Sequence, residues 1–234
     1  ISATGTGKTY ASAFAMRELG FRRVLFLVHR GQLARQTRKS YEKVFANTVS
    51  MGLVGAGYHE YEADYVFATV QTLNRDEHLL QYAKDAFDCI VLDEAHHVPA
   101  DTYRKIMDHF TPKLWLGMTA TPDKRGDNVG GRNVYEIFNY QIAYEIRLQQ
   151  AMEENLLCPF HYFGITDLSM IGDEEAARDF NMLTSDERVR HIVNQADYYG
   201  YSGDKVKGLI FCSNIKETEE RSAKVSQIIN PATG

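Results

Sequence analysis

The sequence predicts an α/β domain with a doubly wound parallel sheet. Short, continuous apolar runs alternate with segments of helical periodicity, and chains with this alternation build parallel sheets covered by helices on both faces. Polar tetrads directly follow several of the apolar runs, where a parallel sheet presents the carboxyl ends of its strands and binds its ligands. The chain of 234 residues is 44% hydrophobic and 24% charged, which is the composition of an ordinary globular protein.

The chain begins with a glycine-rich loop, Ser2-Ala3-Thr4-Gly5-Thr6-Gly7-Lys8-Thr9. Gly5 and Gly7 let the loop turn back with its N–H groups facing inward, and the following helix adds its positive dipole end. Lys8 supplies a charge for β- and γ-phosphates, and the Thr9 hydroxyl is suited to Mg²⁺. This is the spacing of a phosphate-binding loop, with Ser2 in place of its first glycine. The alternative is a chance glycine-rich turn.

The remaining elements are predicted from periodicity and from their boundary residues. Apolar residues at helical spacing continue from the loop to Leu19, with Gly20 as a C-cap. Buried strands are predicted at 24–28, 49–53, 65–68, 89–92 and 114–118, and helices at about 31–45, 79–87 and 101–110. After these come a charged surface loop at 123–133, a helix at 144–155, an extended stretch at 159–165, an acidic connector at 166–179, a helix at 185–199 and a buried strand at 208–212 capped by Ser213 and Asn214.

An acidic pair, Asp93-Glu94, follows the strand at 89–92. A carboxylate at this position can hold Mg²⁺ through its waters, since this ion keeps several waters and takes few carboxylates. The second acid can orient and deprotonate an attacking water. The alternative is a pair of acids that stabilise a helix dipole, and the phosphate loop earlier in the chain disfavours it.

The order of these motifs resembles superfamily 2 helicases and translocases. SATGTGKT at 2–9, FLVHRGQLARQ at 26–36, ATVQTL at 68–73, DEAH at 93–96, GMTATP at 117–122 and GLIFCSN at 208–214 carry the resemblance. Within this superfamily the sequences of these motifs are similar to those of the helicase subunits of type III restriction enzymes. The resemblance implies a RecA-like P-loop fold, with ATP and Mg²⁺ as cofactors. It implies nucleic acid as the partner, DNA rather than RNA.

The resemblance also implies domains and residue roles. Residues 1–165 would be the first RecA-like domain, 166–199 a connector and 200–234 the start of a second RecA-like domain. Asp93 and Thr9 would hold Mg²⁺, Glu94 would activate water, and Lys8 would bind phosphates with the rest of the loop. His96, Thr119 and Thr121 would couple the state of the bound nucleotide to movement on the nucleic acid. Contact with nucleic-acid phosphates is implied for Arg30, Gln36, Thr69, Gln71 and Thr72.

The groove residues have simpler alternatives. Arg30 and Arg35 could belong to a solvated basic helix face, and Gln71 and Thr72 could cap a helix after a strand. His97 fits a local polar role better than a catalytic one. Trp115 fits the core better than a base-stacking platform.

Bulk properties restrict the other function classes. The formal net charge of −5 leaves no overall basic field, so a nucleic-acid site must be a local groove. The three widely spaced cysteines favour a reducing cytoplasm over a disulfide framework or zinc site. No apolar run approaches membrane-spanning length.

The chain is expected to be a fragment, because residue 1 already lies beside the phosphate loop. No stretch after Gly208 resembles the later helicase motifs that supply arginine fingers, so the isolated chain is expected to bind nucleotide weakly and hydrolyse it very slowly. Three alternatives remain open: an RNA helicase, the motor subunit of a restriction endonuclease whose nuclease or methyltransferase part lies elsewhere, and a nucleotide-gated scaffold.

Overall fold

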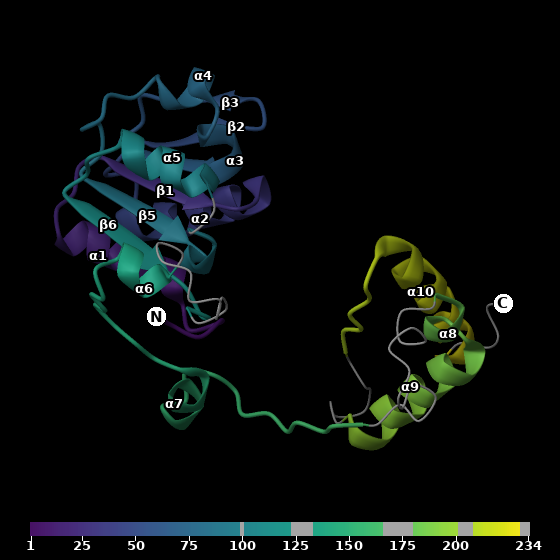
Figure 1. Ribbon diagram of the computed structural model, residues 1–234. Coiled ribbons are helices and arrows are strands. Elements are labelled where there is room, and N and C mark those ends of the chain that lie inside the picture. The colour runs from purple at the N-terminus through teal and green to yellow at the C-terminus, as the bar shows by residue number, and fades with distance from the viewer. Residues whose placement is uncertain (99–100, 123–132, 166–179, 201–207, 230–234) are drawn as a thin grey trace. The chain divides into compact units, whose positions relative to one another are not determined.

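The structure is a computed structural model that describes residues 1–98, 101–122, 133–165, 180–200 and 208–229 (Figure 1). It divides into two compact units, Ile1–Pro159 and Phe160–Gly234. Each unit is described by itself. The predicted surface loop at 123–133, apart from Asn133, and the predicted connector at 166–179 lie outside the described residues.

The first unit is built on a six-stranded sheet with the order β3-β2-β4-β1-β5-β6. All neighbouring strands are parallel except the short β3, which pairs antiparallel with β2 at the sheet edge. The strands are β1 (Val24–Val28), β2 (Met51–Gly55), β3 (Tyr58–His59), β4 (Tyr65–Thr69), β5 (Cys89–Asp93) and β6 (Leu114–Met118).

Helices cover both faces of this sheet, as the sequence predicted. Along β1, Val24, Phe26 and Val28 belong to one core and Leu25 and Leu27 to the other, because successive strand residues point to opposite faces. The first core contains residues of α1 (Lys8–Glu18) and α2 (Gly31–Phe45). The second contains residues of α3 (Val70–Leu73), α4 (Asp76–Leu79) and α5 (Asp101–His109), and α5 lies over this face in Figure 1.

The register of the strands brings their carboxyl ends to one edge. Val28 of β1 pairs with Thr69 of β4, Leu27 of β1 with Leu92 of β5, and Asp93 of β5 with Met118 of β6. The polar residues that follow these strands therefore gather along a single edge of the sheet. The predicted doubly wound α/β fold is confirmed.

The phosphate loop enters the sheet beside β6. The backbone N–H of Ser2 donates to the carbonyl of Thr119 at 2.9 Å, and Ser2 forms a parallel bridge with Ile146. The N–H of Ala3 completes this pairing by donating to the carbonyl of Ile146 at 3.1 Å. The first residues of the chain therefore occupy the position of a further strand.

Two predicted helices of the first unit differ from the structure. The helix predicted at 79–87 is wrong, because α4 ends at Leu79 and the carbonyl of Lys84 instead accepts the N–H of Thr111 at 2.7 Å. The helix predicted at 144–155 is confined to α7 (Leu148–Glu153), since the residues around Ile146 are extended beside the phosphate loop. A short α6 (Val134–Ile137) and the 3-10 helix η1 (Ala95–His97) complete the described elements of this unit.

The described part of the second unit is helical, with α8 (Phe180–Leu183), α9 (Asp186–Tyr199) and α10 (Ile215–Ile229). The helix predicted at 185–199 is confirmed. The strand predicted at 208–212 is wrong: Leu209 and Phe211 are 85% and 88% exposed, and the described residues of this unit provide no neighbouring strand to cover them. Glu217 and Arg221 form a buried ion pair on α10, and Arg221 also donates to the carbonyl of Leu183 at 2.7 Å, which joins α10 to α8.

Candidate functional site

The phosphate loop has the geometry that its glycines permit. Gly5 and Gly7 have φ of +90° and +82°, in the left-handed region that favours glycine. Gly7 directly precedes α1, and no side chain caps that helix. The first amides of an eleven-residue helix are thus left for an anion.

Lys8 is held inside this loop. Its ammonium group donates to the carbonyls of Ser2 and Ala3 at 3.0 and 3.2 Å. The hydroxyl of Thr6 donates to the carbonyl of Ala3 at 2.7 Å and shares a short hydrogen bond with the hydroxyl of Ser2. Ser2, which replaces the first glycine of the motif, therefore helps to fix the loop. Ser2, Thr6 and Lys8 line a hollow of about 780 Å³ whose other walls are mostly apolar.

Asp93 and Glu94 lie at the carboxyl end of β5. Glu94 has φ of +51°, which turns the chain sharply after the strand, and its N–H donates to Oδ1 of Asp93 at 3.1 Å. Burial and the neighbouring charge of Glu94 raise the pKa of Asp93, and the positive charge of Lys8 opposes this shift. Asp93 and the phosphate-loop lysine are thus electrostatically coupled.

His96 joins the acid pair to the end of β6. Its Nδ1 lies 3.0 Å from Oγ1 of Thr119 and 3.3 Å from Oε2 of Glu94, and the residue is only 7% exposed. Oγ1 of Thr119 also accepts the N–H of Thr121 at 3.1 Å. The structure therefore brings together the three residues for which a coupling role was predicted.

The predicted groove residues lie partly together. Thr69 caps α3: its Oγ1 accepts the N–H of Thr72 at 3.2 Å and lies 2.9 Å from the Thr72 hydroxyl. Both threonines line a hollow of about 270 Å³ together with His29 and Arg35. Gln71 is absent from this lining and donates instead to Nδ1 of His29 at 3.1 Å. The cap of α3 is therefore Thr69, not Gln71 or Thr72.

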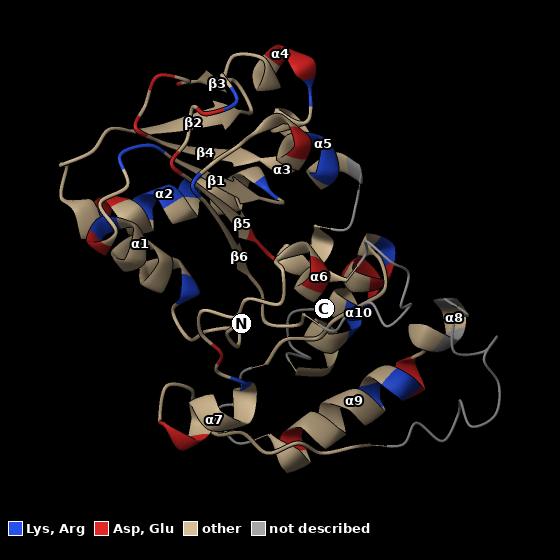
Figure 2. Cartoon of the chain, turned by 60° about the vertical axis from the view of Figure 1, so that its left-hand side comes forward, with Lys and Arg blue, Asp and Glu red and all other residues tan. Residues whose placement is uncertain are grey.

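The basic residues near this groove divide into two groups. Arg38 on α2 pairs with Glu42 at 2.8 Å and with Glu60 at 3.4 Å, which gives it a structural role. Arg30 and Arg35 are exposed and make no ion pair within the described part of the chain. Figure 2 shows the Lys and Arg residues along α2. Arg30 and the exposed Gln36 do not line the 270 Å³ hollow.

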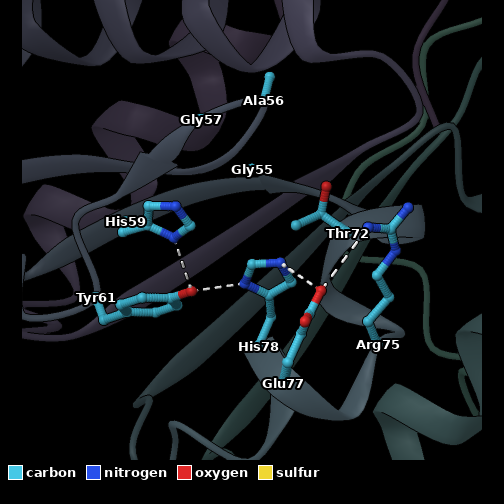
Figure 3. A pocket seen from close by; sticks show the side chains of 9 residues that line it. All are labelled: Gly55, Ala56, Gly57, His59, Tyr61, Thr72, Arg75, Glu77 and His78. Carbon is cyan, nitrogen blue, oxygen red and sulfur yellow. Dashed lines mark hydrogen bonds and ion pairs between the residues drawn. The ribbon is translucent and has the colours of Figure 1, made fainter.

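A third hollow, of about 580 Å³, has the β2–β3 turn in its lining (Figure 3). Gly55, Ala56 and Thr72 line both this hollow and the 270 Å³ hollow. Inside it the hydroxyl of Tyr61 lies 2.6 Å from Nδ1 of His78 and 3.2 Å from Nδ1 of His59. This chain of hydrogen bonds ties β3 to α4 next to the β2–β3 turn, whose residue Ala56 lines both hollows.

Sequence reasoning gave no functional role to three residues beside the site, namely His29, His97 and Tyr103. The His97 ring lies with its centroid 4.1 Å from that of His96 and 4.2 Å from that of His29. Tyr103 of α5 is buried and packs 5.9 Å from His29. The His96-His97 pair and the His29-Arg30 pair after β1 were the available signals, but their contact depends on the sheet register.

The carboxylate oxygens of the acid pair are ligands of the kind that Mg²⁺ prefers. Among the described residues there is no group of three or more His, Cys, Asp or Glu that could hold a metal ion. A site with one carboxylate, one hydroxyl and several waters is typical of Mg²⁺.

No helix in the described ranges is long and apolar enough to cross a membrane.

A known family matches this chain over residues 1–124, under the description "Type III restriction enzyme, res subunit". The chain belongs to this family. The match includes the phosphate loop, the acid pair and the groove residues, and it confirms the resemblance to superfamily 2 motors of restriction enzymes.

Individual relatives agree with this assignment. The chain is 28% identical over 263 residues to a type I restriction enzyme EcoAI endonuclease subunit of Escherichia coli, a match with 99% of this chain and 31% of that protein. The chain thus spans about a third of that relative's length.

Solved structures support the fold. The ATP-dependent type ISP restriction-modification enzyme LlaBIII bound to DNA has a TM-score of 0.66 and 19% identity, over 98% of this chain and 20% of that chain. The Hef helicase domain of Pyrococcus furiosus has a TM-score of 0.52 and 19% identity, over 100% of this chain and 49% of that chain. These likenesses confirm the RecA-like fold of helicase domains.

Proposed function

We propose that this chain carries the ATP-hydrolysing part of a DNA translocase or helicase. The observation that carries the proposal is the meeting of the phosphate loop and the Asp93-Glu94 pair at one edge of the sheet, with His96 joining Glu94 to Thr119. Ligands of doubly wound sheets bind at this edge. Membership of a restriction-enzyme motor family supports the same conclusion.

The residues fit a Mg²⁺-nucleotide. Gly5 and Gly7 already hold the left-handed backbone that a phosphate cradle needs. Asp93 is half-buried beside a second carboxylate, an arrangement that a divalent cation would stabilise. Thr9 and Asp93 would hold the ion, and Lys8 and the amides at the start of α1 would bind the phosphates. Bound Mg²⁺ supplies neutralisation of the phosphate charge.

The chain's own residues then perform the hydrolysis step. Glu94 orients the attacking water and accepts its proton, and the contact with His96 holds the Glu94 side chain in place. Thr119 is hydrogen-bonded to both His96 and the N–H of Thr121. Through these bonds, a movement of the acid pair is transmitted to the end of β6.

Nucleic acid would lie across the hollow lined by Thr69, Thr72 and Arg35. Hydroxyl and guanidinium groups suit phosphate oxygens, and contact with phosphates but not base edges suits a motor that moves over any sequence. Arg30, Gln36 and Gln71 would extend this contact from the neighbouring surface. DNA is favoured over RNA because a similar structure is described as bound to DNA and the E. coli relative as a restriction enzyme subunit.

The motor subunit of a restriction endonuclease is the second candidate. The observation that favours it is the match to the E. coli endonuclease subunit over 99% of this chain. A nuclease or methyltransferase partner would then act from a separate domain or subunit.

The test is ATP turnover with duplex DNA, single-stranded DNA, RNA or no polymer, measured on the longest natural form of the protein. We expect stimulation by DNA, and its loss in Glu94→Gln by about 10²-fold or more, because the general base is removed. Stimulation by RNA alone would move the protein to the RNA helicases. An ATP turnover rate that no polymer changes would contradict the proposal that the groove residues bind nucleic acid. The chain of residues 1–234 alone is expected to turn over slowly, and vigorous DNA-stimulated hydrolysis by it would contradict that expectation.

A further inference from the structure

Two histidines outside the predicted site connect the acid pair to the groove. His97 follows His96 on η1, and the two ring centroids lie 4.1 Å apart. On its other side, His97 meets the ring of His29 at 4.2 Å with an interplanar angle of 88°. This T-shaped arrangement sets the edge of one ring against the face of the other, which is electrostatically favourable for aromatic pairs.

His29 continues the connection to the nucleic-acid side. Its Nδ1 lies 3.1 Å from Nε2 of Gln71. Because an amide nitrogen only donates, Nδ1 of His29 accepts this hydrogen bond and the ring proton of neutral His29 lies on Nε2. His29 also lines the 270 Å³ hollow together with Thr69 and Thr72.

Nε2 of His29 is buried and has no hydrogen-bond partner among the described residues. A buried donor without an acceptor destabilises the state in which it occurs, by about 1–3 kcal/mol. A partner that reached this nitrogen in another state of the protein would remove that cost. Tyr103 restricts the ring from a further side, 5.9 Å away, and the charges of Asp93 and Glu94 add to burial in raising the pKa of its hydroxyl.

We propose that His97 and His29 are positioning residues that transmit the state of the nucleotide site to the groove, through the route Glu94–His96–His97–His29–Gln71. A change in the hydrogen bonding of Glu94 moves His96, the ring contacts carry that movement to His29, and Gln71 changes its position toward the track. The route is separate from the His96–Thr119 contact, which leads to β6. It rests on the proposed function.

The experiment measures the coupling between nucleotide and DNA. The dissociation constant of a short single-stranded DNA is determined with and without a non-hydrolysable ATP analogue, and the ratio of the two constants is the coupling factor. In His97→Ala we expect the coupling factor to fall toward 1, by about fivefold or more, while the affinity for each ligand alone and the melting temperature stay within error. A protein that is merely less well packed would lose stability or affinity instead.

Conservative variants separate the two links at His29. His29→Asn keeps an acceptor near the place of Nδ1 for Gln71 but removes the ring, so the coupling factor falls. His97→Phe keeps a flat ring between His96 and His29, so it restores more of the coupling than His97→Ala does. His109→Gln is the matched control, since His109 is a half-buried histidine that bonds the carbonyl of Tyr82 at 3.0 Å, outside the route.

The outcomes distinguish this inference from the proposed function. A wild-type coupling factor of 1 would overturn the proposed motor itself. A wild-type factor well above 1 that His97→Ala and His29→Asn leave unchanged would overturn the route and leave the motor standing. An equal fall of the coupling factor in His109→Gln would show that any destabilisation of the fold lowers the coupling, and it would also overturn the route.

Discussion

Single residues set the shape of the two hollows around the predicted groove. Gly55 has φ of +107°, and a Cβ placed on it would lie 2.5 Å from Oγ1 of Thr72. Gly57 has φ of +89°, but a Cβ there would meet no atom within 4 Å. The close approach of the β2–β3 turn to Thr72 therefore depends on the absence of a side chain at position 55.

Gly55→Ala is expected to lower both stability and DNA affinity. The new methyl group must displace Thr72 and must also adopt a strained φ, at a cost of about 2–3 kcal/mol in the free energy of unfolding. Urea denaturation and DNA titration measure the two effects. Gly57→Ala is the matched control, because it adds the strain in φ without the collision. Equal losses in the two variants would show that Thr72 does not need the open space at Gly55.

The Asp93 carboxylate lowers the stability of the folded, nucleotide-free protein at neutral pH. Burial and Glu94 raise its pKa, so the charged carboxylate that a metal site requires is disfavoured in the folded protein. Stability from this group is complete below the ordinary pKa of 3.8 and is lost as pH rises through the raised value. At neutral pH the charged side chain therefore destabilises the nucleotide-free fold.

Asp93→Asn is expected to raise the melting temperature of the nucleotide-free protein by a few degrees at pH 7, since it removes a partly desolvated charge. It is expected at the same time to abolish Mg²⁺-dependent nucleotide binding. Thermal unfolding with and without Mg²⁺-nucleotide measures both effects, with the exposed Asp108→Asn as control. A lower melting temperature in Asp93→Asn would mean that the carboxylate is stabilised by its surroundings.

Among the elements, the amino ends of the strands are fixed by one carboxylate. Asp88, just before β5, accepts the backbone N–H groups of Arg22 and Arg23 at 2.9 and 3.0 Å and the ammonium of Lys113 at 2.7 Å. It thus ties the starts of β1, β5 and β6 together at the edge opposite the nucleotide site. These hydrogen bonds, led by that from Lys113, lower the pKa of Asp88.

Asp88→Asn is expected to destabilise the fold by about 1–2 kcal/mol at pH 7, because charge-assisted hydrogen bonds are lost. A carboxylate with a lowered pKa stabilises the fold above the ordinary value of 3.8, and this contribution is lost as pH falls through the lowered value. The stabilities of the wild type and the variant should therefore begin to converge once the pH falls below about 3.8, and they should be closest below the lowered pKa. Denaturation curves between pH 3 and 7 measure this, and a constant difference across that range would contradict it.

Elements could be predicted where local pattern and environment agree. The strands at 24–28 and 114–118 are apolar runs with matching partners, so their predicted bounds are those of the structure. The run at 208–212 has the same composition but no strand beside it among the described residues, and composition alone does not create a neighbour. The segment after Leu79 looks helical, yet its backbone bonds Thr111, a residue far along the chain.

The candidate site divides in the same way. The phosphate loop and the acid pair each lie within a few consecutive residues, so residue type and spacing were sufficient to propose them as a site. The contact between His29 and His97 arises because Leu27 and Leu92 are paired across β1 and β5. Strand register of this kind is set by the whole sheet.

At the scale of the whole molecule, the chain consists of two units that meet in sequence at Pro159. Residues 160–165 have no helix or strand, and Phe160, Tyr162 and Phe163 are 57%, 87% and 50% exposed. Exposed backbone without secondary structure is the preferred substrate of proteases.

Limited digestion with chymotrypsin is expected to cut first at these aromatic residues and to leave a stable fragment close to residues 1–160. The fragment should keep its cooperative unfolding, because both cores of the sheet lie within the first unit. Mass spectrometry of the first products identifies the cut. Early cleavage within 24–118 would contradict the independence of this unit.

The pairing of Ser2 and Ala3 with Ile146 also has a consequence for synthesis in the cell. The phosphate loop is made before residue 146, so it receives this neighbour only after the ribosome has added Ile146. At a rate of about 5–20 residues per second, this interval is on the order of ten seconds. During that time the nascent chain is expected to complete most of its sheet without a finished nucleotide pocket. ATP is therefore expected to stabilise the completed unit and to contribute little to guiding its early folding.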